Sequence, residues 1–377
     1  MLRTGSGSPG VVRMAGTDEL VSASENMETH AAWLKKNPGR QVVYIPELPG
    51  PEQMTGFVTS RLPAGEGMAM VKGYGLIAWA LRAVDVNRIL KGEKPEPVKQ
   101  MSLKPFDQRV VLITGAGRGV GAGLAERFFR DGANIVIAEI DEESGKGQTD
   151  RLNRMSSGNE ALFLHVDVTD ASSVEEMVRQ TVLRFGGIDI AVSNAGVLKA
   201  GGLEEMTPEE FDFVNDVNYH GFFLLAKYVS AVMKRQYRYN PSRFADIIQI
   251  NSKSGLQGSN RNFAYAGSKF GSIGLVQSFA MELVEYGIKV NAVCPGNFFD
   301  LPLWSDPDNG LFIQYLRTGK VPGARTVEEV RKYYENLVPM KRGCRIEDLY
   351  RAVNYIIGQQ YETGQALPVT GGQVMLK

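Results

Sequence analysis

The sequence predicts an α/β fold: a mostly parallel, doubly wound sheet flanked by helices, with a small α/β extension at the N-terminus. Two observations predict the sheet. Short apolar runs alternate with helical stretches, which is typical of βαβ units. The first run leads into a glycine-rich turn that opens a helix. The runs are RVVLITG, NIVIAEI, ALFLHVDV, IDIAVSNAG, DIIQINS, IKVNAVCPG and QALPVTGG.

Composition divides the 377-residue chain into segments. Residues 1–14 lack the apolar core of a signal peptide, and they are predicted to be a flexible leader. Residues 15–95 are predicted to form a small α/β unit for packing or oligomerisation, with a regulatory binding site as the alternative. Its strands are expected in RQVVYIPELPG and GMAMVKGYGLIAWA, and its helices in ENMETHAAWLKKN and RAVDVNRILKG. A proline-rich, charged linker, 96–108, precedes the doubly wound domain, 109–377.

Two helix starts in that domain are marked by capping boxes. Thr207-Pro208-Glu209-Glu210 combines an N-cap, a proline at the first helical position and a glutamate that can reach back. Thr326-Val327-Glu328-Glu329 has the same pattern. The insertion at about residues 297–364 is long enough to form a lid of several helices.

Composition argues against several classes of partner. Lys+Arg and Asp+Glu both number 42, so neither nucleic acid nor an anionic membrane is expected as a partner. No segment has the roughly 18 consecutive apolar residues of a transmembrane helix. The histidines His30, His165 and His220 are scattered, and Cys294 and Cys344 form no cluster, so no metal site is predicted. The cysteines are expected to be reduced thiols of a cytoplasmic protein.

The glycine-rich turn, VVLITGAGRGVGAGLAERF, predicts dinucleotide binding. Glycines lack a Cβ, so the backbone can turn sharply and approach a pyrophosphate. The N-terminus of the following helix offers free N–H groups and a partial positive charge. An ordinary glycine-rich turn is the alternative. The predicted contacts in the turn are Thr114, Gly115, Arg118, Gly119, Val120 and Gly121.

The ends of the later strands refine the cofactor prediction. Glu139 ends the second strand, and an acid about 20 residues beyond such a turn accepts hydrogen bonds from ribose hydroxyls. It would repel the 2′-phosphate of NADP, so NAD is predicted, although Arg118 could pair with that phosphate and favour NADP. Further predicted cofactor contacts follow the third, fourth and sixth strands: Asp167 and Val168, Asn194-Ala195-Gly196, and Pro295-Gly296.

The stretch INSKSGLQGSNRNFAYAGSKFG predicts catalysis. Tyr265 and Lys269 are four apart on a predicted helix and share a face. A phenol titrates near pH 10, and an ammonium together with a nicotinamide cation would lower that pKa. Ser252 would donate a hydrogen bond to a substrate oxygen. Tyr265 would remove the alcohol proton while hydride leaves for the nicotinamide, and both Tyr265 and Lys269 are also predicted cofactor contacts.

Taken together, these motifs resemble the short-chain dehydrogenase/reductase family from about residue 105 to the end. The resemblance implies an NAD(P)-dependent oxidoreductase with a Rossmann sheet. It also implies a fourth catalytic residue, Asn218, which in that family bends a helix and orders a water leading to the lysine. It further implies a homotetramer or homodimer formed through the helix of Tyr265 and its neighbour. The family often has a threonine after Pro295-Gly296; here Asp300 lies near that place, which leaves the nicotinamide contacts to Asn297 or to backbone groups.

Four segments are similar to sorbitol-6-phosphate 2-dehydrogenases: IQINSKSG, GNFF…PLW, VPMKRGC and VTGGQVM. This implies interconversion of a sugar-alcohol phosphate and a ketose phosphate. An unphosphorylated polyol, a sugar or another hydroxy compound is the alternative substrate, and a non-catalytic dinucleotide sensor is the alternative function. The candidate substrate residues are Lys253, Asn297, Lys341 and Arg342, with Arg261, Arg317 and Lys320 as further basic candidates. The apolar residues Phe298, Phe299, Leu301, Trp304 and Leu311 are predicted to be lid core rather than a sugar-stacking platform.

Overall fold

The computed structural model describes residues 104–375, apart from 108, 157, 240, 242, 243 and 318, together with four N-terminal strands. These strands are β1 (Val12–Arg13), β2 (Gln41–Ile45), β3 (Gly67–Val71) and β4 (Gly75–Ala80), paired in the order β1-β2-β4-β3. β1 lies in the predicted leader, and the other three lie in the stretches predicted as strands. The two predicted N-terminal helices, the rest of the leader and most of the linker lie outside the described residues.

The main sheet has seven strands, all parallel, where a mostly parallel sheet was predicted. They are β5 (Val110–Thr114), β6 (Asn134–Glu139), β7 (Ala161–His165), β8 (Ile190–Ser193), β9 (Ala245–Ile250), β10 (Ile288–Pro295) and β11 (Ala366–Val369). Their order is β11-β10-β9-β8-β5-β6-β7. The chain reverses its direction of progress between β5 and β8, and ligands of such sheets bind beyond the carboxyl ends at that point.

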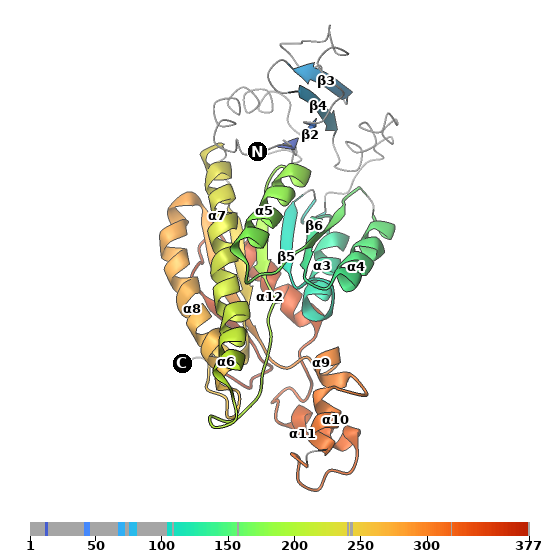
Figure 1. The fold of residues 1–377 in the computed structure, drawn as a ribbon, viewed down its shortest axis with the longest axis vertical. Coiled ribbons are helices and arrows are strands. Elements are labelled where there is room, and N and C mark those ends of the chain that lie inside the picture. Colours follow the sequence, from blue (N-terminus) through green and yellow to red (C-terminus); the bar gives the residue numbers. More distant parts are fainter. Residues whose placement is uncertain are drawn as a thin grey trace.

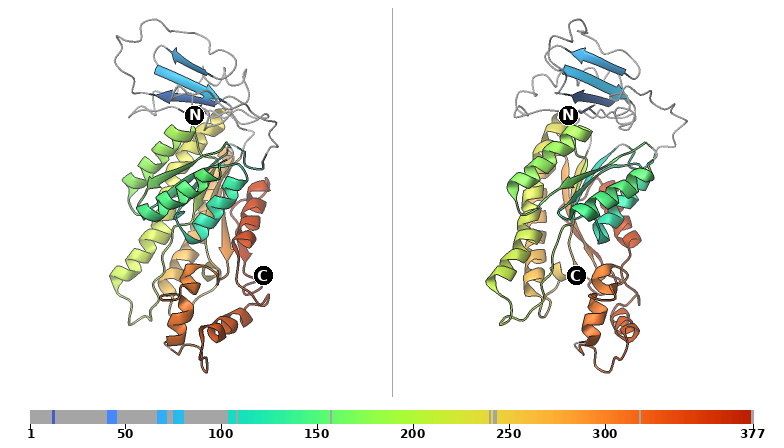
Figure 2. Two further views of the ribbon diagram at one scale, coloured as in Figure 1. Left: turned by 90° about the vertical axis from the view of Figure 1, so that its right-hand side faces the viewer. Right: turned by 45° about the vertical axis from the view of Figure 1, so that its right-hand side comes forward.

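Helices cover both faces of this sheet (Figures 1 and 2). One face carries α5 (Ala171–Phe185), α7 (Gly221–Tyr239) and α8 (Phe263–Leu283), and the other carries α3 (Gly119–Arg130), α4 (Glu142–Arg154) and α12 (Ile346–Gly358). Alternate residues of each strand enter opposite cores, as for Val110 and Val111. Most strand residues are therefore apolar, which is why the strands appear in the sequence as nearly continuous apolar runs.

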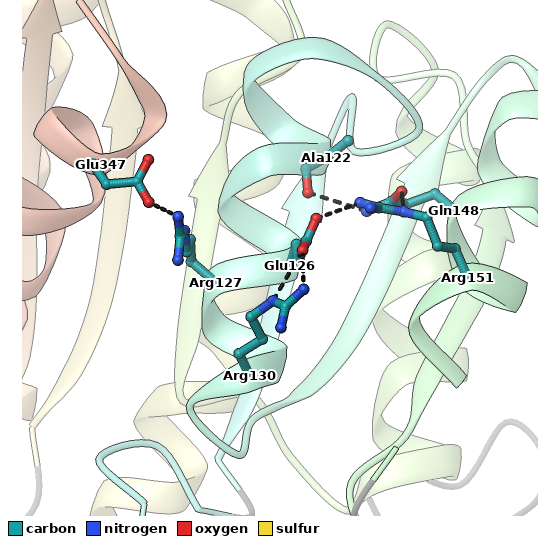
Figure 3. Close-up of polar contacts among 7 residues, drawn as sticks. All are labelled: Ala122, Glu126, Arg127, Arg130, Gln148, Arg151 and Glu347. Atoms are coloured by element: carbon teal, nitrogen blue, oxygen red, sulfur yellow. Dashed lines mark hydrogen bonds and ion pairs between the residues drawn. The ribbon is translucent and has the colours of Figure 1, made fainter. Parts of the chain in front are cut away.

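Polar contacts hold α3, the helix that follows the glycine-rich turn, to a neighbour on each side (Figure 3). Arg127 pairs with Glu347 of α12. Toward α4, Arg151 pairs with Glu126 at 2.6 Å, and the Gln148 amide donates to a backbone carbonyl of α3 at 3.1 Å. Such partly exposed pairs stabilise little individually. Together they fix the orientation of α3, because they hold this helix from both sides.

The two predicted capping boxes are present. Thr207 begins α6 (Pro208–Asn215) with Glu210 reaching back, and Thr326 begins α11 (Val327–Asn336) with Glu329 in the same role.

Within the predicted lid, α9 (Pro302–Ser305), α10 (Leu311–Arg317) and α11 form a unit beyond one end of the sheet (Figure 1, orange). Its core includes Phe299, Trp304 and Leu311, as predicted, whereas Phe298 packs on the core of the sheet. The ring of Trp304 lies 5.0 Å from those of Phe299 and Phe312. The last part of the insertion, α12, instead packs on the sheet because it presents a broad apolar face. That face consists of Leu349, Tyr350, Val353 and Ile356.

A buried lysine joins α12 to the sheet. Lys289 of β10 lies 3.0 Å from Asp246 of β9, and each side chain is only 2% exposed. Its Nζ also donates to the backbone carbonyls of Ile356 and Gln359, at 2.7 and 2.6 Å. The last carbonyls of a helix lack helical partners, and a cation there is favourable. Lys289 thus caps the C-terminal end of α12 from the protein interior.

We expect Lys289→Met to lower the free energy of unfolding by about 3–5 kcal/mol, because it leaves the buried Asp246 carboxyl and the last carbonyls of α12 without their partner. Urea denaturation at neutral pH measures this change. Adding Asp246→Asn should recover part of the loss. The matched control is Lys146→Met, on a side chain that is 61% exposed. Equal midpoints for Lys289→Met and this control would contradict the assignment.

Candidate active site

All seven strands point the same way, so the residues that follow them lie along one edge of the sheet. The predicted motifs follow β5, β6, β7, β8, β9 and β10 at this edge. The structure therefore brings together segments that are more than a hundred residues apart in the sequence.

The glycine-rich turn has the backbone that a close approach to a ligand requires. Gly115 has φ +63° and Gly119 has φ +59°, the left-handed region that favours glycine. A Cβ on Gly121 would lie 2.2 Å from the Gly115 carbonyl oxygen, whereas a Cβ on Gly119 would meet nothing within 4 Å. The N-cap residue Arg118 makes no side-chain cap, which leaves the first N–H groups of α3 available. The turn thus fits a pyrophosphate.

Thr114 and Asn194 lock this turn to the loop after β8. The Thr114 hydroxyl accepts the N–H groups of Asn194 and Ala195, both at 3.1 Å. The Asn194 amide donates in return to the carbonyls of Thr114 and Gly115, at 3.0 and 2.8 Å. The side chain of Asn194 is therefore committed to the turn itself.

Glu139 is fixed beside the same turn. One carboxylate oxygen accepts the N–H of Gly117 at 3.0 Å, and the other accepts those of Ile140 and Asp141 at 3.0 and 3.2 Å. Gly117 was missed in the sequence, although it lies in the same glycine run. A Cβ there would lie 2.9 Å from the Glu139 side chain. Glu139 thus positions the turn as well as ending β6.

The remaining acids at this edge have defined surroundings. The hydrogen bond from the Ser144 N–H and the nearby charge of Arg118 lower the pKa of Asp141. Arg118 is exposed, and its charge lies near the carboxylate of Asp141. Asp167, after β7, accepts the N–H and hydroxyl of Thr169 at 2.9 and 2.8 Å.

Ser252, Tyr265 and Lys269 come together as the sequence predicts. Ser252 begins a single turn after β9, where its hydroxyl accepts the Ser254 N–H at 3.1 Å. Tyr265 and Lys269 lie on α8, with the Lys269 Nζ 5.7 Å from the centre of the tyrosine ring. Lys269 is buried and donates to the Ile250 carbonyl, at the end of β9, at 3.0 Å. The lysine therefore links α8 to the strand that carries the serine.

Burial dominates the titration of these groups. It lowers the pKa of Lys269 to about 8. Burial also raises the pKa of Tyr265, and the hydrogen bond with Ser252 offsets this only in part. The predicted lowering of the Tyr265 pKa includes the charge of a bound nicotinamide. In the protein alone the pKa is raised, because burial disfavours a phenolate more than the nearby groups favour it.

Asn218 lies in a π-helical turn, Asp216–His220, between α6 and α7. Its amide exchanges two hydrogen bonds with the backbone of Val197, at 2.8 and 2.9 Å, and donates to the Ser268 hydroxyl of α8 at 3.1 Å. The helix distortion implied by the family resemblance is present. A Cβ on Gly196 would lie 3.2 Å from the Asn218 side chain and 3.8 Å from the Lys269 Nζ. The loop after β8, Asn218 and the lysine thus form one cluster.

Asn251 is a further residue of this cluster, which the sequence did not reveal. Its side chain accepts the Ser252 N–H at 2.8 Å and donates to the Lys269 carbonyl at 3.0 Å. It therefore fixes the serine relative to the lysine helix. The sequence gives no sign of this role, because no local pattern shows that α8 packs against Asn251.

The candidate substrate residues of the insertion have partners within the protein. Arg342 forms two hydrogen bonds with Asp348, at 2.6 and 3.0 Å, so its charge is compensated. Lys341 donates to the last carbonyl of α11 at 2.9 Å. The Asn297 carbonyl accepts the Cys344 N–H at 2.8 Å. Each of these residues thus has a partner within the insertion or at its ends.

The other charged candidates also differ in their partners. Asp300, near the place of the family's threonine, pairs with Arg331 of α11 at 2.5 Å. Arg261 pairs with Glu205 at 2.5 Å. Lys253 instead donates to the neutral side chain of Gln373 at 3.1 Å.

Within the described part of the chain, no helix is both long and apolar enough to cross a membrane. The same residues contain no group of three or more His, Cys, Asp or Glu side chains that could hold a metal ion. Both cysteines are free thiols.

Comparisons with known proteins agree with this geometry. A family model described as short chain dehydrogenase matches residues 109–300. Sorbitol-6-phosphate 2-dehydrogenase of Escherichia coli (strain K12) is 33% identical over 270 residues, which are 71% of this chain and 99% of that protein. The crystal structure of sorbitol-6-phosphate 2-dehydrogenase from Erwinia amylovora matches with TM-score 0.63 and 35% identity, over 71% of this chain and 100% of that one. NAD+-bound xylitol dehydrogenase matches with TM-score 0.63 and 28% identity, over the same shares.

The matched regions contain the glycine-rich turn and the serine, tyrosine and lysine at the edge of the sheet. These groups suit a dinucleotide cofactor and a small-molecule alcohol. The chain belongs to the short-chain dehydrogenase/reductase family, the NAD(P)-dependent oxidoreductases that act on CH–OH groups.

Proposed function

We propose that the protein is an NAD-dependent dehydrogenase that interconverts a sugar-alcohol phosphate, such as sorbitol 6-phosphate, and a ketose phosphate. The observation that carries the proposal is the cluster of Ser252, Tyr265 and Lys269 beside the glycine-rich turn. The likeness to two sorbitol-6-phosphate 2-dehydrogenases supports the choice of substrate. A purely binding protein would need none of these three side chains, which argues against the sensor alternative.

Each of the clustered side chains has a separate role in the proposed reaction. Bound NAD supplies the acceptor for the hydride that leaves the alcohol carbon. Ser252 donates a hydrogen bond to the substrate oxygen and positions it, and Tyr265 accepts the proton of the alcohol. Lys269 holds the end of β9 and places its positive charge beside the tyrosine ring. Asn218 keeps the loop after β8 against α8.

We propose NAD rather than NADP because backbone N–H groups hold the carboxylate of Glu139 at the end of β6. There it would accept hydrogen bonds from the ribose and repel a 2′-phosphate. The likeness to an NAD+-bound xylitol dehydrogenase supports this choice. The proposed cofactor contacts are Thr114, Gly115, Arg118, Gly119, Val120, Gly121, Glu139, Asp167, Val168, Asn194, Ala195, Gly196, Tyr265, Lys269, Pro295 and Gly296.

An unphosphorylated polyol is the second candidate substrate. The xylitol dehydrogenase has the same TM-score as the sorbitol-6-phosphate enzyme, so the fold favours neither class. The choice depends on the groups that surround the far end of the substrate.

We also propose a homodimer or homotetramer formed through α7 and α8. Large apolar side chains are exposed on and beside these helices, including Tyr219, Phe223, Phe270 at 45% and Met281 at 82%. Exposed apolar patches of this kind mark interaction surfaces, and closed symmetric oligomers are the common outcome. The free thiols of both cysteines support a reducing, cytoplasmic location.

The first experiment offers the protein sorbitol, xylitol and sorbitol 6-phosphate, each with NAD and with NADP, and follows the absorbance of the reduced cofactor. We expect the highest kcat/KM with sorbitol 6-phosphate and NAD. Turnover of the unphosphorylated polyols alone would establish the second candidate instead. Tight NADH binding without any turnover would contradict the proposed reaction.

Tyr265→Phe removes the phenolic oxygen that accepts the proton. We expect kcat to fall about 100- to 10,000-fold, the usual contribution of general acid–base catalysis, while NADH binding remains. Steady-state rates and fluorescence titration with NADH measure the two effects. Tyr361→Phe is the matched control, because that side chain is fully exposed. Wild-type kcat in Tyr265→Phe would disprove the role of the phenol.

Phe270→Glu places a charge on the proposed interface. We expect the oligomer to dissociate, because burying an unpaired carboxylate costs several kcal/mol. Light scattering on a size-exclusion column gives the mass. Tyr361→Glu serves as the control, and an unchanged mass for Phe270→Glu would show that the interface lies elsewhere.

A further inference from the structure

Lys253 has a distinct place in the site. It directly follows Ser252, in the turn after β9, and is half-buried there. Its Nζ donates to the side-chain oxygen of Gln373 at 3.1 Å. The two residues are 120 positions apart in the sequence, so this contact depends on the complete fold.

The charge of Lys253 is not balanced by a carboxylate among the described residues. Two of the other basic candidates differ, because Arg261 and Arg342 each pair with an acid. An amide oxygen orients an ammonium without neutralising it. Burial lowers the pKa of Lys253. A cation held away from water in this way gains from any anion that reaches it.

Gln373 is itself held by the segment after β11. The Thr370 hydroxyl accepts the Val374 N–H at 3.2 Å and donates to the Val374 carbonyl at 3.1 Å, which closes a turn around Gln373. A Cβ on Gly296 would lie 3.6 Å from the Gln373 oxygen. Gln373 therefore lies between the serine turn and the loop after β10, where the nicotinamide contacts are expected.

The same segment meets the helical insertion. The Gly371 carbonyl accepts the Met340 N–H at 3.2 Å, just after α11. Earlier in the insertion, burial and the nearby charge of Arg261 lower the pKa of Lys320. Because Arg261 is paired with Glu205, Lys320 and Lys253 are the cations of this region without a carboxylate partner among the described residues.

We propose that Lys253, oriented by Gln373, binds the phosphate of a phosphorylated polyol, so that the segment after β11 supplies part of the substrate specificity. This inference rests on the proposed function. It assigns the anionic end of the substrate to Lys253 and the reacting hydroxyl to Ser252 and Tyr265. Because the side chain of Lys253 leaves the chain one residue after Ser252, one short turn holds both ends of the molecule.

The test compares kcat/KM for sorbitol 6-phosphate and for sorbitol in the whole chain and its variants. Lys253→Met should reduce the phosphate-to-polyol ratio about 10- to 100-fold, mainly through KM, as expected for the loss of a charge-assisted hydrogen bond. Lys253→Arg should keep most of the ratio. Gln373→Glu should reduce it as Lys253→Met does, because the new carboxylate neutralises the ammonium. Lys332→Met, exposed on α11, removes the same charge and should leave the ratio unchanged.

An unchanged ratio in Lys253→Met and Gln373→Glu would overturn the proposal, and so would an equal loss in Lys332→Met. A sugar carboxylate that is a better substrate than the phosphate would overturn the choice of phosphate. Thermal stabilisation by sorbitol 6-phosphate separates this proposal from the proposed function. If the wild type turns over neither substrate but is stabilised, and Lys253→Met is not, the subsite stands while the reaction fails. No stabilisation of the wild type would remove the subsite.

Discussion

The parallel pairing of β5, β8 and β9 is the constraint on which the site depends. Its register places Ile113 opposite Val192, and Val192 opposite Ile248, so the three strands end within one residue of one another. Thr114 can then accept two N–H groups from the loop after β8. Lys269 can also reach the last carbonyl of β9. A slip of one residue would turn every side chain of a strand to the other face. The apolar cores on both faces oppose that slip, and they therefore hold the geometry of the site as well as the fold.

Polar side chains then fix the reacting groups relative to one another. Asn251 joins the serine turn to α8, and Asn218 joins α8 to the loop after β8. Both amides are buried and bond to the backbone, whose position the sheet and helices determine. Few rearrangements are needed when substrate arrives, which is how a preorganised site lowers a reaction barrier. The raised pKa of Tyr265 shows the corresponding cost, since the same burial disfavours the phenolate that catalysis requires.

Most of the correct predictions came from local sequence patterns. The seven strands were visible as apolar runs, and the turn after β5 by its glycines. Tyr265 and Lys269 were recognisable because a spacing of four places side chains on one helical face. Contacts between distant segments were not visible: Glu139 with Gly117, Asn251 with α8, and Lys253 with Gln373. The apolar stripe of α12 likewise did not reveal whether its partner was the insertion or the sheet. Such choices are decided by tertiary packing, for which a single sequence gives no local signal.

The π-helical turn at Asp216–His220 constrains how the chain can change in length. Such a turn contains one residue more than the regular helix would need. Removing that residue would restore ordinary helical hydrogen bonds, and α6 and α7 would each remain well formed. It would also remove the local widening of the helix, so the residues of the turn would point in new directions while α6 and α7 kept their places. Asn218 could then no longer meet both Val197 and α8. A single deletion here would therefore preserve the helices but disrupt the site.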